Sequence, residues 1–254
     1  MNPSNAILIS EYALRIGDTS LILGQRLGEW CGHGPVLEED IALTNISLDL
    51  IGQARAFLTY AGEQLTPKKS EDDLAFFRDA REFRNALLAE QPNGDFGQTV
   101  LRQLFVSAFH FYFFREMIKS QDKTFAALAE KSLKEVTYHL RHSSDWTIRL
   151  GDGTEESKRR MMLAIDELWK YTGDLFLMDE IDEKLIKVGI AVDLNGIRKN
   201  WEKHIQEVML EASLPLPESA FMVTGGYQGL HTENLGHLLS EMQILPRSFP
   251  GAEW

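Results

Sequence analysis

Cysteine is almost absent from this sequence, since Cys31 is the only one among 254 residues. A single thiol excludes an internal disulfide framework and a zinc site built from cysteines, and it fits a reducing compartment. No apolar run approaches the roughly 18 residues that a membrane-spanning helix needs. The N-terminal stretch MNPSNAILISEYALRIGD has no basic region, and its apolar run stops at Ser10 and Glu11. We therefore expect no secretory signal and a soluble cytoplasmic protein.

Positive charge is also scarce. The chain has 26 Lys and Arg residues against 38 Asp and Glu residues, a formal net charge of −12. Nucleic acids and anionic membranes both favour surfaces rich in Lys and Arg, so neither is expected as a partner. The hydrophobic fraction of 44% and the charged fraction of 25% are ordinary for a soluble globular protein with a buried core.

Strand-like alternation is missing as well, and helical periodicity takes its place. In residues 38–65, for example, apolar residues recur at steps of three and four, which predicts one face of a long helix. Turn-forming stretches such as CGHGP, TPKKS, QPNGD, GDGT and LPLP separate the periodic segments. We predict a single all-α domain over residues 1–254, with helices at about 6–30, 37–65, 70–91, 96–120, 122–150, 155–178, 193–212 and 232–245.

The segment LRQLFVSAFHFYFF at 101–114 is apolar and aromatic nearly all round from Leu104 onward. A helix without a polar face is expected at the centre of a bundle, wrapped by other helices. Long helices with short connections favour antiparallel neighbours. The acidic runs LEED and MDEIDEK are expected to be helix starts or solvated faces.

One stretch, KSLKEVTYHLRHSSDW, places Glu135 and His139 on one helix face. Di-iron bundles take a carboxylate from each of two helices and a Glu-x-x-His pair from each of two others. Here the residue three before His139 is Val136, which cannot bind a metal. The comparable pair in RDAREFRNALL is Glu82 followed by Asn85, and asparagine is a poor iron ligand in place of imidazole.

The other predicted helices add little to such a site. Asp49 is a plausible single carboxylate, and the aromatic helix offers only Ser107 and His110. The set is short of both carboxylates and histidines. We therefore favour a hydrogen-bonded polar cluster in a bundle core over a metal site, and we expect His110 to be a core histidine.

The other candidate residues give even weaker evidence of a catalytic or binding site. Cys31 and His33 are a thiol and an imidazole two residues apart, but catalytic Cys/His pairs are rarely built this way, and Cys31 is expected to be a small buried hydrophobe. His231 and His237 follow a Gly-Gly pair that is more typical of a turn than of a binding site. The sequence has no P-loop, dinucleotide-binding fingerprint, H-E-x-x-H or G-x-S-x-G motif.

Four long stretches together resemble a known family. They are LGQRLGEWCGHGPVLEEDIALTNISLDLIGQARAFL, AEQPNGDFGQT, KEVTYHLRHSSDW and TGGYQGLHTENLGHLLSEMQILPRSFPGAEW. The chain is similar to the C subunits of bacterial phenylacetyl-CoA epoxidases, multicomponent monooxygenases of aerobic phenylacetate breakdown. The resemblance spans nearly the whole chain. It implies a ferritin-like helical bundle with additional C-terminal helices.

The resemblance also implies that the sister A subunit holds a di-iron centre, whereas the C subunit has lost the metal ligands. The A subunit's ligand positions resemble Asp49 on the first helix, Glu82 and Asn85 on the second, the neighbourhood of Ser107 on the third, and Val136 and His139 on the fourth, with Glu135 displaced by one. These seven residues are called the relic positions below. No catalytic residue, metal or cofactor is expected in this chain.

The function implied by the resemblance is that of a non-catalytic structural subunit. It would pair with the catalytic A subunit and help to assemble the oxygenase with the B subunit and a reductase. The complex would epoxidise phenylacetyl-CoA with O₂ and NADPH. Two alternatives stay open: an active di-iron oxygenase or oxidase with an atypical metal site at Asp49, Glu82, Glu135 and His139, and a module that binds CoA esters, which the net charge disfavours.

Overall fold

Helices form all the regular structure in the computed structural model, which describes residues 3–217 and 221–252. The predicted all-α class is thereby confirmed, and no strand occurs in those ranges. None of the helices described is long and apolar enough to cross a membrane. The chain divides into two compact units, residues 1–92 with 225–254 (unit 1) and residues 93–224 (unit 2). The single domain expected from the sequence stays a prediction.

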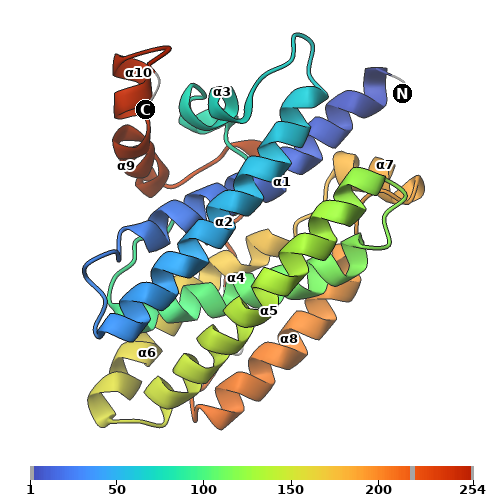
Figure 1. Cartoon of the computed structure of the whole chain (residues 1–254). Helices are drawn as coiled ribbons and strands as arrows, with labels where there is room; N and C mark the ends of the chain where they lie inside the picture. The colour runs from blue at the N-terminus through green and yellow to red at the C-terminus, as the bar shows by residue number, and fades with distance from the viewer. Residues whose placement is uncertain (1–2, 218–220, 253–254) are drawn as a thin grey trace. The chain divides into compact units, whose positions relative to one another are not determined.

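Unit 1 is built on a hairpin of two long helices, α1 and α2, which pack side by side along their lengths (Figure 1). Nearly every residue of α1 between Tyr12 and Gly24 is buried. Shorter helices from both ends of the unit complete it. Its elements are α1 (Pro3–Gly28), α2 (Leu37–Glu63), α3 (Glu71–Phe76), η1 (Ala80–Glu82), η3 (Gly226–Gln228), α9 (Glu233–Met242) and α10 (Ile244–Ser248).

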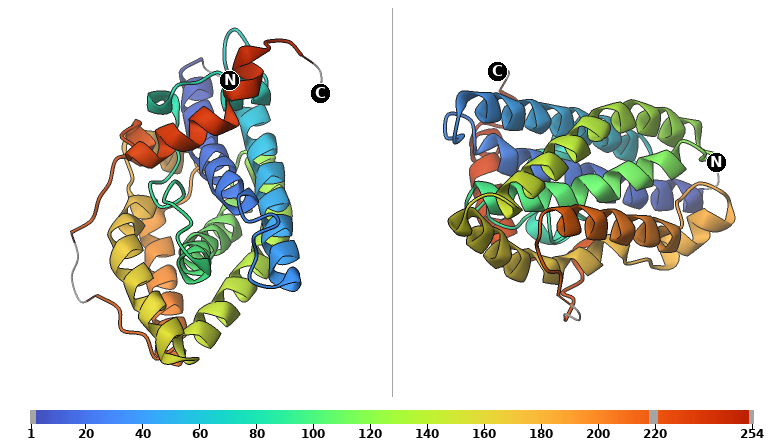
Figure 2. Two further views of the ribbon diagram at one scale, coloured as in Figure 1. Left: turned by 90° about the vertical axis from the view of Figure 1, so that its left-hand side faces the viewer. Right: turned by 90° about the horizontal axis from the view of Figure 1, so that it is seen from below.

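Unit 2 is organised around α4, and α5, α6 and α8 pack against it (Figure 2). This central place agrees with the prediction made from the aromatic segment 101–114. Trp201 on α8 also donates a 2.8 Å hydrogen bond from its indole nitrogen to the carbonyl of Phe105 on α4. The elements are α4 (Phe96–Met117), α5 (Lys123–Gly151), α6 (Glu155–Leu168), η2 (Trp169–Phe176), α7 (Glu180–Lys187) and α8 (Leu194–Glu211).

Most helices begin where a short polar side chain can satisfy the first backbone N–H groups. Asp122 accepts hydrogen bonds from the backbone of Thr124 and Phe125 at 3.0 and 3.1 Å, and Asp95 accepts one from Gln98 at 2.9 Å. Asp179 caps α7 within the acidic run MDEIDEK, and LEED opens α2. Both acidic runs are therefore helix starts, as expected. The helices α7 and α10 themselves were not predicted.

The helix predicted over 70–91 is wrong. The chain forms α3, then the single turn η1, and residues 83–92 run outside regular helix. The backbone N–H of Arg84 donates to Asp18 Oδ2 at 2.8 Å, and that of Ala86 donates to Thr19 Oγ1 at 3.0 Å. Because side chains of α1 accept from these two N–H groups, the N–H groups cannot bond the carbonyls four residues earlier, and η1 does not continue as a helix.

Candidate functional site

The relic positions of unit 2 lie on two neighbouring helices, α4 and α5. Ser107 on α4 and His139 on α5 are each 1% exposed, and Val136 is fully buried. Glu135 is half-buried. The polar side chains that the sequence singled out on these helices thus occur within a buried region of the unit. The resemblance implies that the A subunit has a carboxylate at the position of Val136, and this chain has two methyl groups there instead.

His110 and Gln103 are two further buried polar residues of α4. Burial, and secondarily the charge of His139, lower the pKa of His110 to about 3, so its imidazole is uncharged at neutral pH. Its ring lies 5.4 Å from that of Phe114, and the residue is 2% exposed, so the predicted core histidine is confirmed. Gln103 Nε2 donates to Ser107 Oγ at 2.8 Å. A buried imidazole that resists protonation is a poor general acid.

The relic positions of unit 1 are dispersed rather than gathered on one helix face. Asp49 is half-buried on α2. Glu82 is exposed, and its carboxylate accepts a 2.8 Å hydrogen bond from the backbone N–H of Asp79, at the start of η1. Asn85 is buried in the irregular segment that follows. The sequence pattern predicts Glu82 and Asn85 one turn apart on a helix over 70–91. In the structure no helix spans both residues.

No group of three or more His, Cys, Asp and Glu side chains that could hold a metal ion occurs among the residues that the structure describes. A convergence of the relic positions of unit 1 with those of unit 2 stays a prediction. Cys31 is exposed in the turn after α1, so the expectation of a buried thiol is wrong. His33 Nδ1 contacts the carbonyl of Cys31 at 3.2 Å, which is a local turn contact.

Unit 1 contains a buried polar network that the sequence does not predict. Its centre is Glu90, which is fully buried. Glu90 Oε2 accepts hydrogen bonds from Asn85 Nδ2 and His231 Nδ1, both at 2.8 Å. Its Oε1 accepts from the backbone N–H of Thr232 at 2.6 Å and from the Thr232 hydroxyl at 2.8 Å. Four donors on two carboxylate oxygens satisfy a buried negative charge well.

His231 is held from both sides of its ring. Nδ1 faces the Glu90 carboxylate at 2.8 Å, and Nε2 faces the carbonyl of Phe83 at 3.0 Å. Both partners, the ionised carboxylate of Glu90 and the carbonyl of Phe83, accept hydrogen bonds. Each ring nitrogen of His231 must therefore carry a hydrogen, and the ring with two N–H groups is the imidazolium form. Burial lowers the pKa of His231, but the hydrogen bond and charge of Glu90, together with the Phe83 carbonyl and Asp18, raise it above 6.5. The network therefore contains a buried ion pair.

A second buried ion pair fixes the start of the irregular segment. Asp18 on α1 is fully buried and pairs with the guanidinium of Arg78, whose side chain is 5% exposed. Arg78 Nη1 also donates to the carbonyl of Glu82 at 3.0 Å. Gln243, at the end of α9, donates to the carbonyls of Ala75 and Arg78, each at 3.0 Å. Both ion pairs hold parts of unit 1 together and present no reactive group to solvent.

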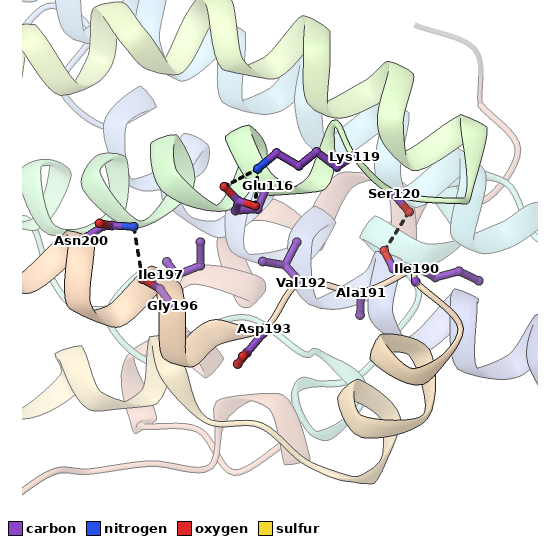
Figure 3. A pocket seen from close by; sticks show the side chains of 11 residues that line it. Glu116, Lys119, Ser120, Ile190, Ala191, Val192, Asp193, Gly196, Ile197 and Asn200 are labelled. Atoms are coloured by element: carbon purple, nitrogen blue, oxygen red, sulfur yellow. Dashed lines mark hydrogen bonds and ion pairs between the residues drawn. The ribbon is translucent and has the colours of Figure 1, made fainter.

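A pocket of about 370 Å³ opens in unit 2 where α4 ends and α8 begins (Figure 3). Two of its charged residues form an ion pair, in which Lys119 Nζ donates to both oxygens of Glu116 at 2.7 and 2.8 Å. The third, Asp193, caps the start of α8. Ser120 Oγ donates to the carbonyl of Ile190 at 2.8 Å. These side chains offer neither a nucleophile with a base nor an acid/base pair, so the pocket has no catalytic constellation.

Comparison with known proteins gives two results. The family described as phenylacetic acid catabolic protein matches residues 1–254. The chain is 51% identical over 246 residues to a protein of Escherichia coli (strain K12) named as the C subunit of 1,2-phenylacetyl-CoA epoxidase, and the match covers 97% of this chain and 99% of that protein. The C-terminal stretch that carried the resemblance ends at residues 253–254, which lie outside the described ranges. The chain belongs to the phenylacetic acid catabolic protein family.

Proposed function

We propose that this chain is a non-catalytic structural subunit of a cytoplasmic phenylacetyl-CoA epoxidase, where it pairs with and supports the subunit that carries the di-iron centre. Its similarity over 97% of its length to a protein named as an epoxidase subunit supports membership of such a complex. The relative's name says nothing of a catalytic or a structural role. The proposed lack of a catalytic role rests on the residues of this chain itself.

The observation that carries the proposal is Val136, fully buried on α5 one turn before His139. An apolar side chain at this position cannot bind iron. Asn85 supports the same conclusion, because its side-chain nitrogen donates to Glu90. Two of the positions that resemble di-iron ligands thus have another structural use.

The rival function, an active oxygenase with an atypical site, requires Glu82 as a ligand. That carboxylate is exposed and bonds the backbone of Asp79 instead. The third alternative, a CoA-ester module, requires positive charge near a polyanionic ligand, and the net charge of −12 opposes it. Isothermal titration of the isolated chain with phenylacetyl-CoA tests this alternative directly.

Iron content tests the proposal itself. The chain is expressed alone, loaded aerobically with Fe(II), desalted and measured by elemental analysis, beside the catalytic subunit treated in the same way. We expect no stoichiometric iron in this chain. About two iron atoms per chain, the content of a di-iron bundle, would overturn the proposal.

A further inference from the structure

The last part of unit 1 is a separate stretch of sequence that closes onto the first part. We call residues 225–252 the C-terminal arm, and they contain η3, α9 and α10. The arm begins at Gly225, whose φ is +130°, and Gly229 has φ +75°. Glycine has no Cβ and adopts such angles readily. The base of the arm is therefore a suitable place for a hinge.

The far end of the arm is anchored by groups that do not titrate near neutral pH. Gln243 Nε2 donates to the carbonyls of Ala75 and Arg78, each at 3.0 Å. Arg247 Nε donates to the carbonyl of Phe76 at 3.0 Å, and its Nη2 donates to that of Arg78 at 2.9 Å. Amides, carbonyls and guanidinium groups keep the same charge throughout this range. This anchor should hold equally well at each pH.

The near end of the arm depends on a titratable side chain, His231. Its Nδ1 lies 2.8 Å from Glu90 Oε2, and its Nε2 lies 3.0 Å from the carbonyl oxygen of Phe83. A neutral ring has one N–H, so its other nitrogen would turn a lone pair toward an oxygen at hydrogen-bond distance. Because the side chain is 4% exposed, bulk solvent cannot relieve this repulsion. The geometry therefore favours the imidazolium form.

The charged groups around His231 favour the same form. Burial lowers its pKa, but Glu90, the carbonyl of Phe83 and Asp18 raise it, and the net effect is a pKa above 6.5. Glu233, two residues along the chain, is exposed. The guanidinium groups of this region each bond an acidic side chain: Arg78 bonds Asp18, Arg84 bonds Glu11 and Arg26 bonds Glu29. Their positive charges are thereby compensated.

The two ends of the arm should therefore respond differently to a rise in pH. We propose that the C-terminal arm is a proton-controlled clasp, closed while His231 is imidazolium and opening at the start of α9 when His231 loses its proton. Opening separates Glu90 from the backbone and hydroxyl of Thr232, which now bond it at 2.6 and 2.8 Å. It also exposes the buried apolar residues of α9, which are Leu235, Leu238 and Leu239.

Hydrogen exchange of the full chain between about pH 6 and pH 9 tests the clasp, with rates corrected for the intrinsic pH dependence of amide exchange. Protection of amides in residues 233–242 and 83–92 should fall as pH rises above about 6.5, by up to about tenfold per pH unit. It should level off above the pKa of His231 in the closed arm. Amides of α4, in unit 2, should keep their protection.

Two substitutions on the arm separate the proton from the contact. His231→Gln should abolish the pH response of α9, because an amide does not titrate. His237→Gln is the matched control at an exposed position of the same helix, and it should keep the full response. Histidine NMR of the unsubstituted chain gives a measurement that needs no variant. The titration midpoint of His231 should lie above 6.5, within the pH range in which α9 loses protection.

Protection of residues 233–242 that does not change with pH, or an equal change in His231→Gln, would overturn this inference. So would an equal loss of protection in α4, because the whole chain would then be unfolding. A His231 midpoint at or below 6.5 would contradict it as well. The inference goes beyond the proposed function and does not depend on it, because neither iron nor a partner subunit enters the measurement.

Discussion

Glu90 and His231 are 141 residues apart in the chain, yet their side chains meet in a 2.8 Å hydrogen bond inside unit 1. The His231 side chain is 4% exposed and that of Glu90 is fully buried. This contact ties the irregular segment after η1 to the stretch that leads into α9. The stability of unit 1 should therefore depend on it more than on any exposed ion pair.

Replacing His231 by leucine should lower the free energy of unfolding by about 3 kcal/mol, because a buried carboxylate then loses its charged partner. Chemical denaturation followed by circular dichroism measures this change. The matched control is His237→Leu, at an exposed position of α9, and it should have little effect. Equal effects of the two substitutions would contradict a structural role for the Glu90–His231 contact.

The same contact should make stability decline as pH rises above about 6.5. The pKa of His231 is raised in the folded chain, so its contribution is complete below the unfolded value of about 6.5 and is lost as pH rises through the folded value. Denaturation curves from neutral to mildly alkaline pH measure this loss. In His231→Gln the decline over this range should be smaller. A decline of the same size in the unsubstituted chain and in His231→Gln would show that other titrating groups cause the decline.

His110 should act in the opposite direction. Its folded pKa of about 3 lies below the unfolded value, so between the two the unfolded chain binds more protons. Stability should therefore fall with decreasing pH, by up to about 1.4 kcal/mol per pH unit from this residue. His110→Phe should reduce the slope between pH 6 and pH 4 (about the range in which histidine titrates when unfolded). An unchanged slope would show that carboxylates account for it.

Arg78→Leu should also be costly, by about 3–5 kcal/mol, since it leaves Asp18 charged and buried without its partner. Hydrogen exchange of residues 83–92 provides a second measurement, because Asp18 also accepts from the backbone of Arg84. We expect faster exchange in this segment. The control Arg198→Leu removes an exposed pair with Glu202 on α8 and should change neither quantity.

In the reconstituted epoxidase, His139→Leu should leave the turnover rate within a few-fold of normal, because the proposed function gives this residue no part in the chemistry. Co-purification verifies that the complex is intact, and iron analysis verifies that the catalytic subunit is loaded. A loss of about a hundredfold with both intact would mean that His139 contributes to the transition state.

The long helices could be predicted because their apolar residues recur with the helical period over many turns. The predicted ranges 37–65, 96–120 and 122–150 agree with α2, α4 and α5 to within three residues at each end. Residues 70–91 carry a similar pattern but fold differently, since side chains of Asp18 and Thr19 take backbone donors there. Such distant partners leave no periodic signal in the sequence.

The relic positions were found through resemblance, whereas the Glu90 network was missed. Nothing near Glu90 in the sequence indicates that its partners come from residues 231 and 232. The one local signal is the glycine-rich stretch TGGYQGLH, whose Gly-Gly pair is typical of a turn. Gly229 has φ +75°, and an added Cβ would overlap the carbonyl of Arg81, so glycine lets this turn approach η1 closely.

The division of unit 1 into two stretches of sequence affects how the protein is made. Residues 93–224 form a continuous unit, whereas residues 1–92 require residues 225–254 to complete theirs. During synthesis Glu90 leaves the ribosome long before His231 and Thr232, so its carboxylate has no such donors until translation has passed through all of unit 2. The second unit can therefore fold on the ribosome before the first, against the usual N-to-C order of domains.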